Sequence, residues 1–412
     1  MKVLMLCQRL VFSSHENKMR RTTGYSYMVL DIIKALLRQG VSVDIYAIAS
    51  DQSREYYGAN VLLHSFWDII TNIKTKYLLL GMKRVRQYNP GFRMALTIMY
   101  YYASCGLVEK HINSSDYDAI HIHGLGYGGR AYADCCEIYG KRYLLTLHAM
   151  ASFSARNVRK PGQVRNEEDY LLSFVNSDNL MTVVSSRMKS DICARYNSGV
   201  DLARISVVLN GISGSAFKVD DHIDVRSEFH IEPRIKLLLS VGNLSERKNQ
   251  AAIIRALSVM DDITRKSLCV LFLGEDFLDG ELALLAKNKQ MLQYVRFCGA
   301  LKRSELTSFY QQADLNLTVS ISEAFGLPII EGFLFGLPSL MMADLEAKDD
   351  LYSSIAMELV KDRTDEALAI GIGDALSRQW DRLAIRKYSE KFSMEETIKG
   401  YRDIYNHLTI NN

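Results

Sequence analysis

The sequence predicts an α/β protein of two domains, each built around a doubly wound parallel sheet. Its 412 residues exceed the length over which one hydrophobic core usually grows, so two domains are expected. Short apolar runs alternate with longer helical patterns along the chain, which is typical of parallel sheets with helices on both faces. A new series of strands and helices starts at Lys236, after a polar and acidic stretch, and this restart indicates the second domain.

Nine apolar runs are predicted to be strands. They are Val3–Leu6, Val41–Tyr46, Ala119–Ile122, Tyr143–Leu147, Leu180–Val184, Lys236–Val241, Leu268–Leu273, Val295–Cys298 and Leu315–Val319. The first helix is the clearest, because Met28, Ile32 and Leu36 recur at helical spacing and Gly40 follows as a stop signal. A β-α-β unit therefore opens the chain.

The domain boundary is expected in the polar stretch that precedes the second series of strands. We predict a Rossmann-like N-terminal domain over residues 1–205, a Rossmann-like C-terminal domain over residues 206–390 and a helical segment over residues 391–412. Ser393 and Glu396 have the spacing of a capping box at the start of that last segment.

Composition and charge exclude several classes of protein. Hydrophobic residues make up 48% and charged residues 24%, which argues against disorder and coiled coils. The net charge of +3, from 50 Lys and Arg against 47 Asp and Glu, is too balanced to indicate nucleic-acid binding. Seven cysteines without CxxC spacing fit a reducing compartment, and the N-terminal apolar run is too short for an export signal. We therefore expect a cytoplasmic protein.

Two glutamates, Glu323 and Glu331, lie eight residues apart in the segment SISEAFGLPIIEGFLFGLP, which follows a predicted strand. Pro328 suits the first turn of a helix, where its missing N–H costs little. Glu331 would then lie about one turn into the helix, where a carboxylate can accept two hydrogen bonds from a ribose diol. The alternative is a capped, solvated helix start.

The turn before that helix is a second candidate binding element. Phe325, Gly326 and Leu327 would form it, with their amides free to receive a phosphate or a sugar hydroxyl. In open doubly wound sheets, ligands bind beyond the carboxyl ends of the strands, which is where this turn falls.

The pattern S-x-S-E-A-F-G-L-P-x-x-E-x-x-x-x-G-x-P resembles the Glu-x7-Glu signature of retaining GT-B glycosyltransferases (glycosyl transferases group 1, glycosyltransferase family 4-like). In that family the first glutamate contacts the donor sugar and the second contacts the ribose, which implies these roles for Glu323 and Glu331. The resemblance implies two Rossmann-like domains facing a central cleft, an acceptor-binding one and a nucleotide-sugar-binding one. It also implies that the C-terminal helix packs back on the N-terminal domain.

Upstream, VGNLSERKN resembles the family's Gly-Arg-Leu-x-x-x-Lys-Gly loop, whose arginine and lysine neutralise the donor diphosphate. Gly242 and Lys248 match, but Asn243 stands at the arginine position. Asparagine can donate a hydrogen bond and supplies no charge. Arg247 is a candidate to compensate, and its alternative is an exposed loop residue. The resemblance thus implies donor binding by Asn243, Arg247 and Lys248.

In the N-terminal half, His148 ends a predicted strand and matches the family's strand-end histidine, which implies contact with the donor sugar or the reacting centre. His121 and His123 alternate along another strand, but no third ligand stands at a supporting spacing, so no metal site is assigned. We expect strand packing for His121 and cleft lining for His123. Gly24 matches a glycine-containing loop that lies near the donor phosphates in the family.

Residues 69–94 combine six basic side chains with apolar ones and contain no acidic residue. Such a segment can lie on an anionic membrane, which would place the protein at the inner face of the plasma membrane. The alternative is an amphipathic helix that docks on its own domain and keeps its charges in water.

The resemblance implies a metal-independent transfer of a sugar from a nucleotide-diphosphate sugar to an acceptor hydroxyl, with retention of configuration and no cofactor. The acceptor would be a glycan or a lipid-linked sugar in bacterial-type cell-surface polysaccharide or glycolipid synthesis. Two alternatives remain open: a catalytically impaired GT-B subunit that stabilises a partner enzyme, suggested by Asn243, and a nucleotide-sugar epimerase on the same fold.

Overall fold

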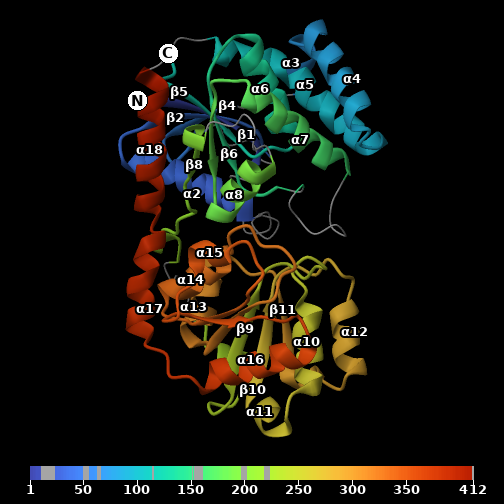
Figure 1. The fold of residues 1–412 in the computed structure, drawn as a ribbon, viewed down its shortest axis with the longest axis vertical. Helices are drawn as coiled ribbons and strands as arrows, with labels where there is room; N and C mark the ends of the chain where they lie inside the picture. The colour runs from blue at the N-terminus through green and yellow to red at the C-terminus, as the bar shows by residue number, and fades with distance from the viewer. Residues whose placement is uncertain are drawn as a thin grey trace. The chain divides into compact units, whose positions relative to one another are not determined.

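The computed structural model describes residues 1–10, 24–49, 55–62, 66–113, 116–150, 152, 161–195, 202–217 and 223–410. The chain forms two compact units, the first made of Met1–Asn210 with Met394–Asn412 and the second of Gly211–Ser393. Each unit carries a parallel sheet covered by helices, so the predicted α/β fold class is confirmed (Figure 1).

The first unit has an eight-stranded sheet of order β3-β4-β2-β1-β5-β6-β7-β8. Adjacent strands are parallel, except that β3 is antiparallel to β4. The strands are β1 (Lys2–Leu10), β2 (Ser42–Ala49), β3 (Glu55–Tyr56), β4 (Ala59–Leu62), β5 (Ala119–His123), β6 (Leu144–Leu147), β7 (Leu180–Val183) and β8 (Ile205–Val207).

In the first sheet, β2 lies on one side of β1, and β5 and β6 lie on the other side. Because connections between parallel strands are right-handed, the helices that lead in these two directions lie on opposite faces of the sheet. Helices α2 and α18 contact each other on one side, whereas α6 contacts β1 and β5 and is covered by α5 (Figure 1). The helices are α2 (Gly24–Arg38), α3 (Phe66–Thr71), α4 (Thr75–Tyr88), α5 (Phe92–Ile112), α6 (Tyr127–Ile138), α7 (Pro161–Val175), α8 (Ser186–Arg195) and α18 (Met394–Ile410).

Helix α18 belongs to the first unit although it ends the chain, as the sequence predicts. Its Tyr401 and Tyr405 are fully buried, and Thr397 Oγ1 donates a hydrogen bond to the carbonyl of Leu209 at 2.9 Å. Gly400 carries no side chain at a point where a Cβ would lie 3.3 Å from Val208. The helix can therefore approach the end of the sheet closely.

The second unit has a six-stranded, fully parallel sheet of order β11-β10-β9-β12-β13-β14. Its strands are β9 (Lys236–Val241), β10 (Leu268–Leu273), β11 (Val295–Gly299), β12 (Leu315–Thr318), β13 (Ser339–Met342) and β14 (Met357–Val360). Its helices are α9 (Val225–Glu228), α10 (Gln250–Val259), α11 (Asp262–Lys266), α12 (Glu281–Asn288), α13 (Arg303–Gln312), α14 (Leu327–Leu334), α15 (Lys348–Leu351), α16 (Asp365–Ser377) and α17 (Arg382–Ser389).

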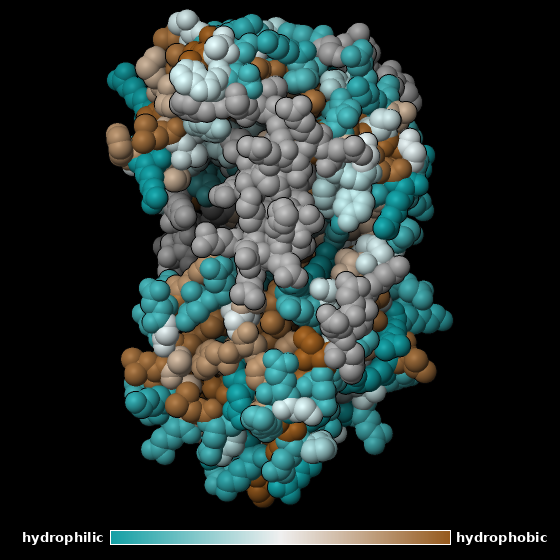
Figure 2. Space-filling model, turned by 180° about the vertical axis from the view of Figure 1, so that it is seen from behind, coloured by the Kyte–Doolittle hydropathy of each residue, from teal (hydrophilic) through white to brown (hydrophobic). Residues whose placement is uncertain are grey.

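The strand order of the second unit reverses at β9, with β10 on one side and β12 on the other. The loops that leave the carboxyl ends of β9 and β12 are therefore neighbours, and this is the position at which doubly wound sheets bind ligands. Hydrophobic surface is visible between the hydrophilic residues of this unit (Figure 2), and its exposed apolar side chains include Ile263, Phe277 and Leu284. No helix in the described ranges is long and apolar enough to cross a membrane.

Candidate functional site

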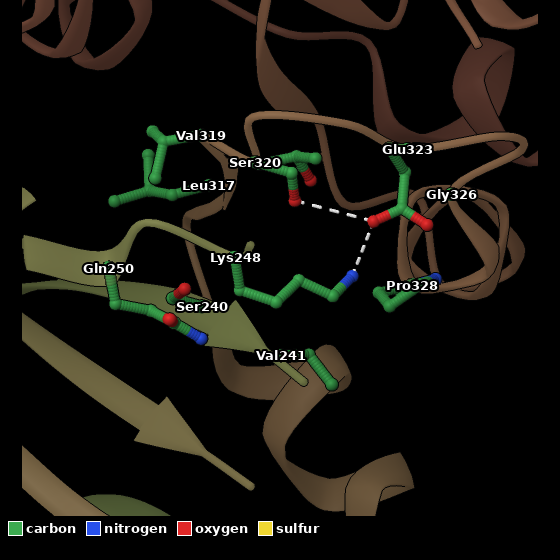
Figure 3. Close-up of a pocket in the computed structure, with 11 residues that line it drawn as sticks. Ser240, Val241, Lys248, Gln250, Leu317, Val319, Ser320, Glu323, Gly326 and Pro328 are labelled. Carbon is green, nitrogen blue, oxygen red and sulfur yellow. Dashed lines mark hydrogen bonds and ion pairs between the residues drawn. The ribbon is translucent and has the colours of Figure 1, made fainter. Parts of the chain in front are cut away.

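A pocket lies at the carboxyl ends of β9 and β12 in the second unit. It is lined by Ser240, Val241, Lys248, Gln250, Leu317, Thr318, Val319, Ser320, Glu323, Gly326 and Pro328. The loop after β9 brings Lys248 to this pocket, and the loop after β12 brings Glu323 (Figure 3). Two residues predicted from separate motifs therefore line one cavity.

Lys248 and Glu323 form an ion pair at the centre of the pocket. Lys248 Nζ lies 2.5 Å from Glu323 Oε2, and the two side chains are only 14% and 13% exposed. Ser320 Oγ donates to the same carboxylate oxygen at 3.3 Å (Figure 3). Burial alone would raise the pKa of Glu323, but the charges of Lys248 and Arg247 and the hydrogen bonds lower it below its usual value. Glu323 is thus an anion at neutral pH.

The backbone around Lys248 depends on two glycines. Gly242 has φ +135°, and a Cβ there would lie 3.1 Å from Lys248 Cε. A Cβ on Gly274, which follows β10, would lie 2.2 Å from the carbonyl oxygen of Gly242. Since a side chain at either position would displace neighbouring atoms, the two strand-end loops can meet only with glycine at these positions.

Arg247 lies beside the same carboxylate. Its Nη1 donates to the carbonyl of Ser322 at 3.0 Å and lies 3.5 Å from Glu323 Oε2, while its side chain is 46% exposed. Asn243 instead accepts a hydrogen bond at Oδ1 from the amide of Glu275 at 3.3 Å. The Asn243 oxygen therefore stabilises the loop that contains Glu275. The positive charge near the pocket comes from Lys248 and Arg247.

Of the predicted turn residues, Phe325 and Gly326 precede α14, and Leu327 is the first residue of the helix. Gly326 has φ +81° and caps the helix, and Gly326 and Pro328 line the pocket. Phe325 is 3% exposed, and its ring packs edge-on to Phe392. In the described part of the chain no group accepts a hydrogen bond from the amides of Phe325, Gly326 or Leu327. These N–H groups are available to an anion.

Glu331 lies on α14 but does not line the pocket. It is 7% exposed, and its Oε1 lies 3.1 Å from Arg303 Nη2 while its Oε2 accepts from Tyr310 OH at 2.9 Å. Both carboxylate oxygens therefore already bind residues of α13. The local sequence pattern does not indicate Arg303 or Tyr310 as partners of Glu331, because both lie more than twenty positions before it in the chain.

Glu346 is a further residue that the motifs did not indicate. Its Oε2 accepts from the amide of Glu323 at 2.9 Å, and its Oε1 accepts from Ser322 Oγ at 3.0 Å. The loop that carries Glu323 is therefore held at its backbone, which fixes the direction of the carboxylate toward Lys248.

In the first unit, His148 directly follows β6. Its Nε2 lies 3.1 Å from Nδ1 of His123, and its ring packs edge-on to Tyr25 with 5.3 Å between centroids. Gly24 is the exposed first residue of α2, next to Tyr25. His121 is fully buried in strand packing as expected. His123, expected to line the cleft, is instead fully buried, with its ring between those of His121 and His148.

The basic segment 69–94 is only partly exposed. Arg84 points inward to Asp134 and Asp169, at 2.9 and 2.6 Å. Lys74 and Lys76 both pair with Glu109 of α5. The described residues contain no group of three or more His, Cys, Asp or Glu side chains placed to hold a metal ion.

Comparison with known proteins identifies the family. The family model for glycosyl transferases group 1 matches residues 223–392, and the model for Glycosyltransferase Family 4 matches residues 22–214. The chain belongs to the group 1 glycosyltransferases. The glycosyltransferase is 24% identical over 404 residues to D-inositol 3-phosphate glycosyltransferase of Xylanimonas cellulosilytica, a match that covers 94% of this chain and 92% of the relative.

Solved structures show that the glycosyltransferase has the GT-B fold. Sucrose-phosphate synthase from Thermosynechococcus elongatus matches with a TM-score of 0.70 at 16% identity, over 98% of this chain and 100% of that one. HepE of Anabaena in complex with UDP and glucose matches with a TM-score of 0.69 at 15% identity, over 99% and 100%.

The histidines His121, His123 and His148 predict how the stability of the glycosyltransferase depends on pH. Burial lowers the pKa of His148 to about 4 and holds the pKa of His121 and His123 well below the usual value. Between about pH 6.5 and pH 4 the unfolded chain binds protons that the native rings do not, so stability falls as pH falls. We expect each such ring to contribute up to about 1.4 kcal/mol per pH unit in this range.

Urea unfolding of the first unit, followed at several pH values between about 7 and 4.5, measures this slope. The variant His148→Gln should reduce the slope by about one proton. Equal slopes in wild type and His148→Gln would show that His148 titrates normally in the folded protein.

Proposed function

We propose that this glycosyltransferase moves a sugar from a nucleotide-diphosphate sugar to an acceptor hydroxyl, with retention of anomeric configuration. The observation that carries the proposal is the Lys248–Glu323 ion pair in the pocket between the β9 and β12 loops. A departing diphosphate needs positive charge and hydrogen-bond donors, while a sugar needs a fixed carboxylate to orient its hydroxyls. The pocket supplies both at adjacent positions.

The donor diphosphate would bind Lys248, Arg247 and the unpaired amides of the turn at Phe325–Leu327. Lys248 would then exchange part of its contact with Glu323 for the phosphate oxygens, which frees the Glu323 carboxylate to accept from the sugar. We propose contact with the donor sugar also for His148. The proposal includes no metal ion or other cofactor, since the cationic side chains supply the charge, and EDTA is expected to leave the rate unchanged.

Support for a nucleotide donor also comes from the neighbours, since HepE is described in complexes with UDP and with UDP-glucose. For Glu331 the ribose role remains a proposal, and it would require the carboxylate to accept from ribose in addition to Arg303 and Tyr310. For Asn243 the side-chain amide nitrogen would be the donor, because its oxygen accepts from Glu275.

A donor and acceptor panel tests the function. Purified protein would be incubated with UDP-glucose, UDP-galactose, UDP-N-acetylglucosamine, GDP-mannose and ADP-glucose, and the unfolding temperature and nucleotide release would be measured with and without acceptors. Acceptors would include inositol 3-phosphate, suggested by the names of the relatives, and lipid-linked sugars. We expect at least one donor to raise the unfolding temperature and release of its nucleotide to require an acceptor.

Each alternative gives a different result in the same panel. Isomerised donor without any acceptor would indicate an epimerase, and donor binding without turnover would indicate an impaired subunit. If no donor binds, the proposed function is wrong. The configuration of the product at the anomeric carbon, read by NMR coupling constants, tests retention separately.

We also propose that the acceptor is a glycan or lipid-linked sugar used for cell-surface polysaccharide or glycolipid, reached by peripheral contact with the inner face of the plasma membrane. On α4, Leu79, Met82, Lys83 and Arg86 follow helical spacing and share one exposed face. The opposite face packs inside the unit through Tyr77 and its helical neighbours. Hydrophobic and hydrophilic surface alternate over the first unit in Figure 2.

Exposed apolar side chains also occur on the helices before and after α4. Trp67 on α3 is 71% exposed, and Phe92 in the first turn of α5 is 82% exposed beside Arg93. Lys83, Arg86 and Arg93 form no ion pair with a described residue. Large apolar groups next to unpaired cations are the chemistry that binds an anionic lipid surface.

Neutralising the three cations is expected to weaken vesicle binding about 100-fold, because each basic residue near an anionic surface contributes about 1 kcal/mol. The variant is Lys83→Gln, Arg86→Gln and Arg93→Gln together, and the measurement is flotation with vesicles of phosphatidylglycerol and phosphatidylcholine.

A matched control neutralises three exposed lysines of the second unit, Lys287, Lys289 and Lys361, and should float like the wild type. If the first variant also floats like the wild type, α4 is an ordinary solvated helix face and the membrane proposal is wrong.

A further inference from the structure

Three histidine rings follow one another at the carboxyl ends of β5 and β6. His121 and His123 are two residues apart on β5, so their side chains lie on the same face of the sheet, with 3.9 Å between ring centroids. The ring of His123 stacks on His148 at 5.4 Å with an interplanar angle of 22°. Only His148, at the end of this series, is partly exposed.

The inner ring, His121, has both nitrogens occupied by hydroxyl groups. Its Nδ1 lies 2.6 Å from Tyr405 OH on α18, and its Nε2 lies 2.7 Å from Thr146 Oγ1. Thr146 in turn contacts Thr182 Oγ1 at 2.5 Å. Since both ring nitrogens of His121 have partners, this residue forms a fixed surface against which His123 packs.

Among the described residues, the middle ring, His123, has a single hydrogen-bond partner. Its Nδ1 lies 3.1 Å from Nε2 of His148, while its own Nε2 is buried and has no partner in the part of the chain that the structure describes. Tyr25 OH donates to the backbone carbonyl of His123 at 3.0 Å, and its ring packs against His148, which restricts the His148 ring. The bond between the two histidines therefore holds one hydrogen, and its position depends on the protonation of His123.

The position of this hydrogen follows from Nε2 of His123, which has no partner among the described residues. A neutral imidazole carries one hydrogen, on either Nδ1 or Nε2. If His123 carried it on Nε2, a buried N–H would have no acceptor, and such orphaned donors are rarer than unpaired acceptors. The hydrogen therefore belongs on His123 Nδ1, from which it is donated to His148 Nε2. An accepting Nε2 requires that the hydrogen of His148 is on Nδ1.

We infer that His123 is a positioning residue that holds His148 in the Nδ1–H tautomer, so that the second ring nitrogen of His148 is a hydrogen-bond donor and not a basic nitrogen. Burial keeps both rings neutral near pH 7, which the tautomer assignment requires. No described residue accepts from Nδ1 of His148. A group that binds there must offer an acceptor, such as a sugar hydroxyl or ring oxygen. The effect on turnover rests on the proposed function.

The tautomer can be measured without any substrate. Long-range 1H–15N correlation spectra of uniformly 15N-histidine-labelled protein near pH 7 distinguish protonated from unprotonated ring nitrogens, and the His148→Gln variant identifies the His148 signals among the nine histidines. We expect His148 to show a protonated Nδ1 and an unprotonated Nε2. The Nε2–H pattern in the wild type would overturn the inference, whatever the activity.

Two variants of His123 then separate hydrogen bonding from packing. His123→Phe keeps a ring but cannot donate, so His148 is expected to change tautomer and kcat to fall about tenfold, the fold-change of one neutral hydrogen bond. His123→Gln restores an N–H donor and is expected to recover the Nδ1–H pattern and part of kcat. If His123→Phe leaves the His148 tautomer unchanged, the inference is wrong.

Failure of the proposed function would look different. If no donor is turned over while wild-type His148 shows the Nδ1–H pattern and His123→Phe abolishes it, the positioning role stands and the catalytic proposal falls. If donors are turned over but His148 is Nε2–H, the proposed function stands and this inference falls.

Discussion

Replacing Lys248 by alanine is expected to lower kcat/KM by about 100- to 1,000-fold, the effect of removing one positioned donor from a developing negative charge. In the free protein Lys248 Nζ contacts the Glu323 carboxylate at 2.5 Å, inside a pocket with little solvent around it. Its removal takes away the diphosphate contact and also lets the pKa of Glu323 rise, because Lys248 is the strongest influence that lowers it. Steady-state kinetics with the best donor of the panel measure the loss.

Lys236→Ala is the matched control for this variant. Lys236 begins β9, at the opposite end of the strand from the pocket, where it is 50% exposed and pairs with Asp314. Its replacement should leave kcat/KM within about twofold, as expected for an exposed pair. If Lys248→Ala stays within about threefold of the wild type, the diphosphate does not depend on Lys248 and the pocket has another role.

Replacing Asp134 by alanine is expected to destabilise the first unit by about 3–5 kcal/mol, because two buried arginines lose a shared partner. Asp134 is 4% exposed and lies 2.9 Å from Arg84 and 2.7 Å from Arg130, and Tyr102 OH donates to the same carboxylate. Asp169 remains near both arginines, but one carboxylate then faces two cations. Urea unfolding monitored by circular dichroism measures the change.

The exposed pair Arg187–Asp191 provides the comparison within the same unit. Its atoms are 3.0 Å apart, but the side chains are 56% and 27% exposed, so Asp191→Ala should cost at most about 0.5 kcal/mol. Equal destabilisation by the two substitutions would contradict the view that burial, and not the ion pair itself, sets the effect.

The fold class could be predicted because the nine predicted apolar runs all contain strands. The strands that were not predicted include β8 with three residues and β13 and β14 with four each. In β14 the sequence Met-Glu-Leu-Val gives no clear period, and its hydrogen bonds come from pairing with β13. Such strands are determined by their neighbours in space, which local pattern does not contain.

The candidate site could be predicted only where a single loop contains a recognisable sequence motif. The motifs around Lys248 and Glu323 identify residues that the structure brings together in one pocket, although their roles remain predictions. The ion pair between Glu331 and Arg303 could not be foreseen, because it joins two helices through the fold. The burial of Arg84 was not predicted either. Among the basic residues of segment 69–94, Arg84 lies on the same buried face of α4 as Tyr77 and Tyr88.

The chain crosses between its two units twice, since α18 returns to the first unit after Ser393. A fragment that ends at Asn210 would therefore lack Tyr401 and Tyr405, which fill the buried space beside His121 and Thr146. Truncation before Met394 would therefore damage the first unit, while the second unit, Gly211–Ser393, keeps all its own strands. Domain exchange with a relative should accordingly transfer residues 1–210 and 394–412 together as one set.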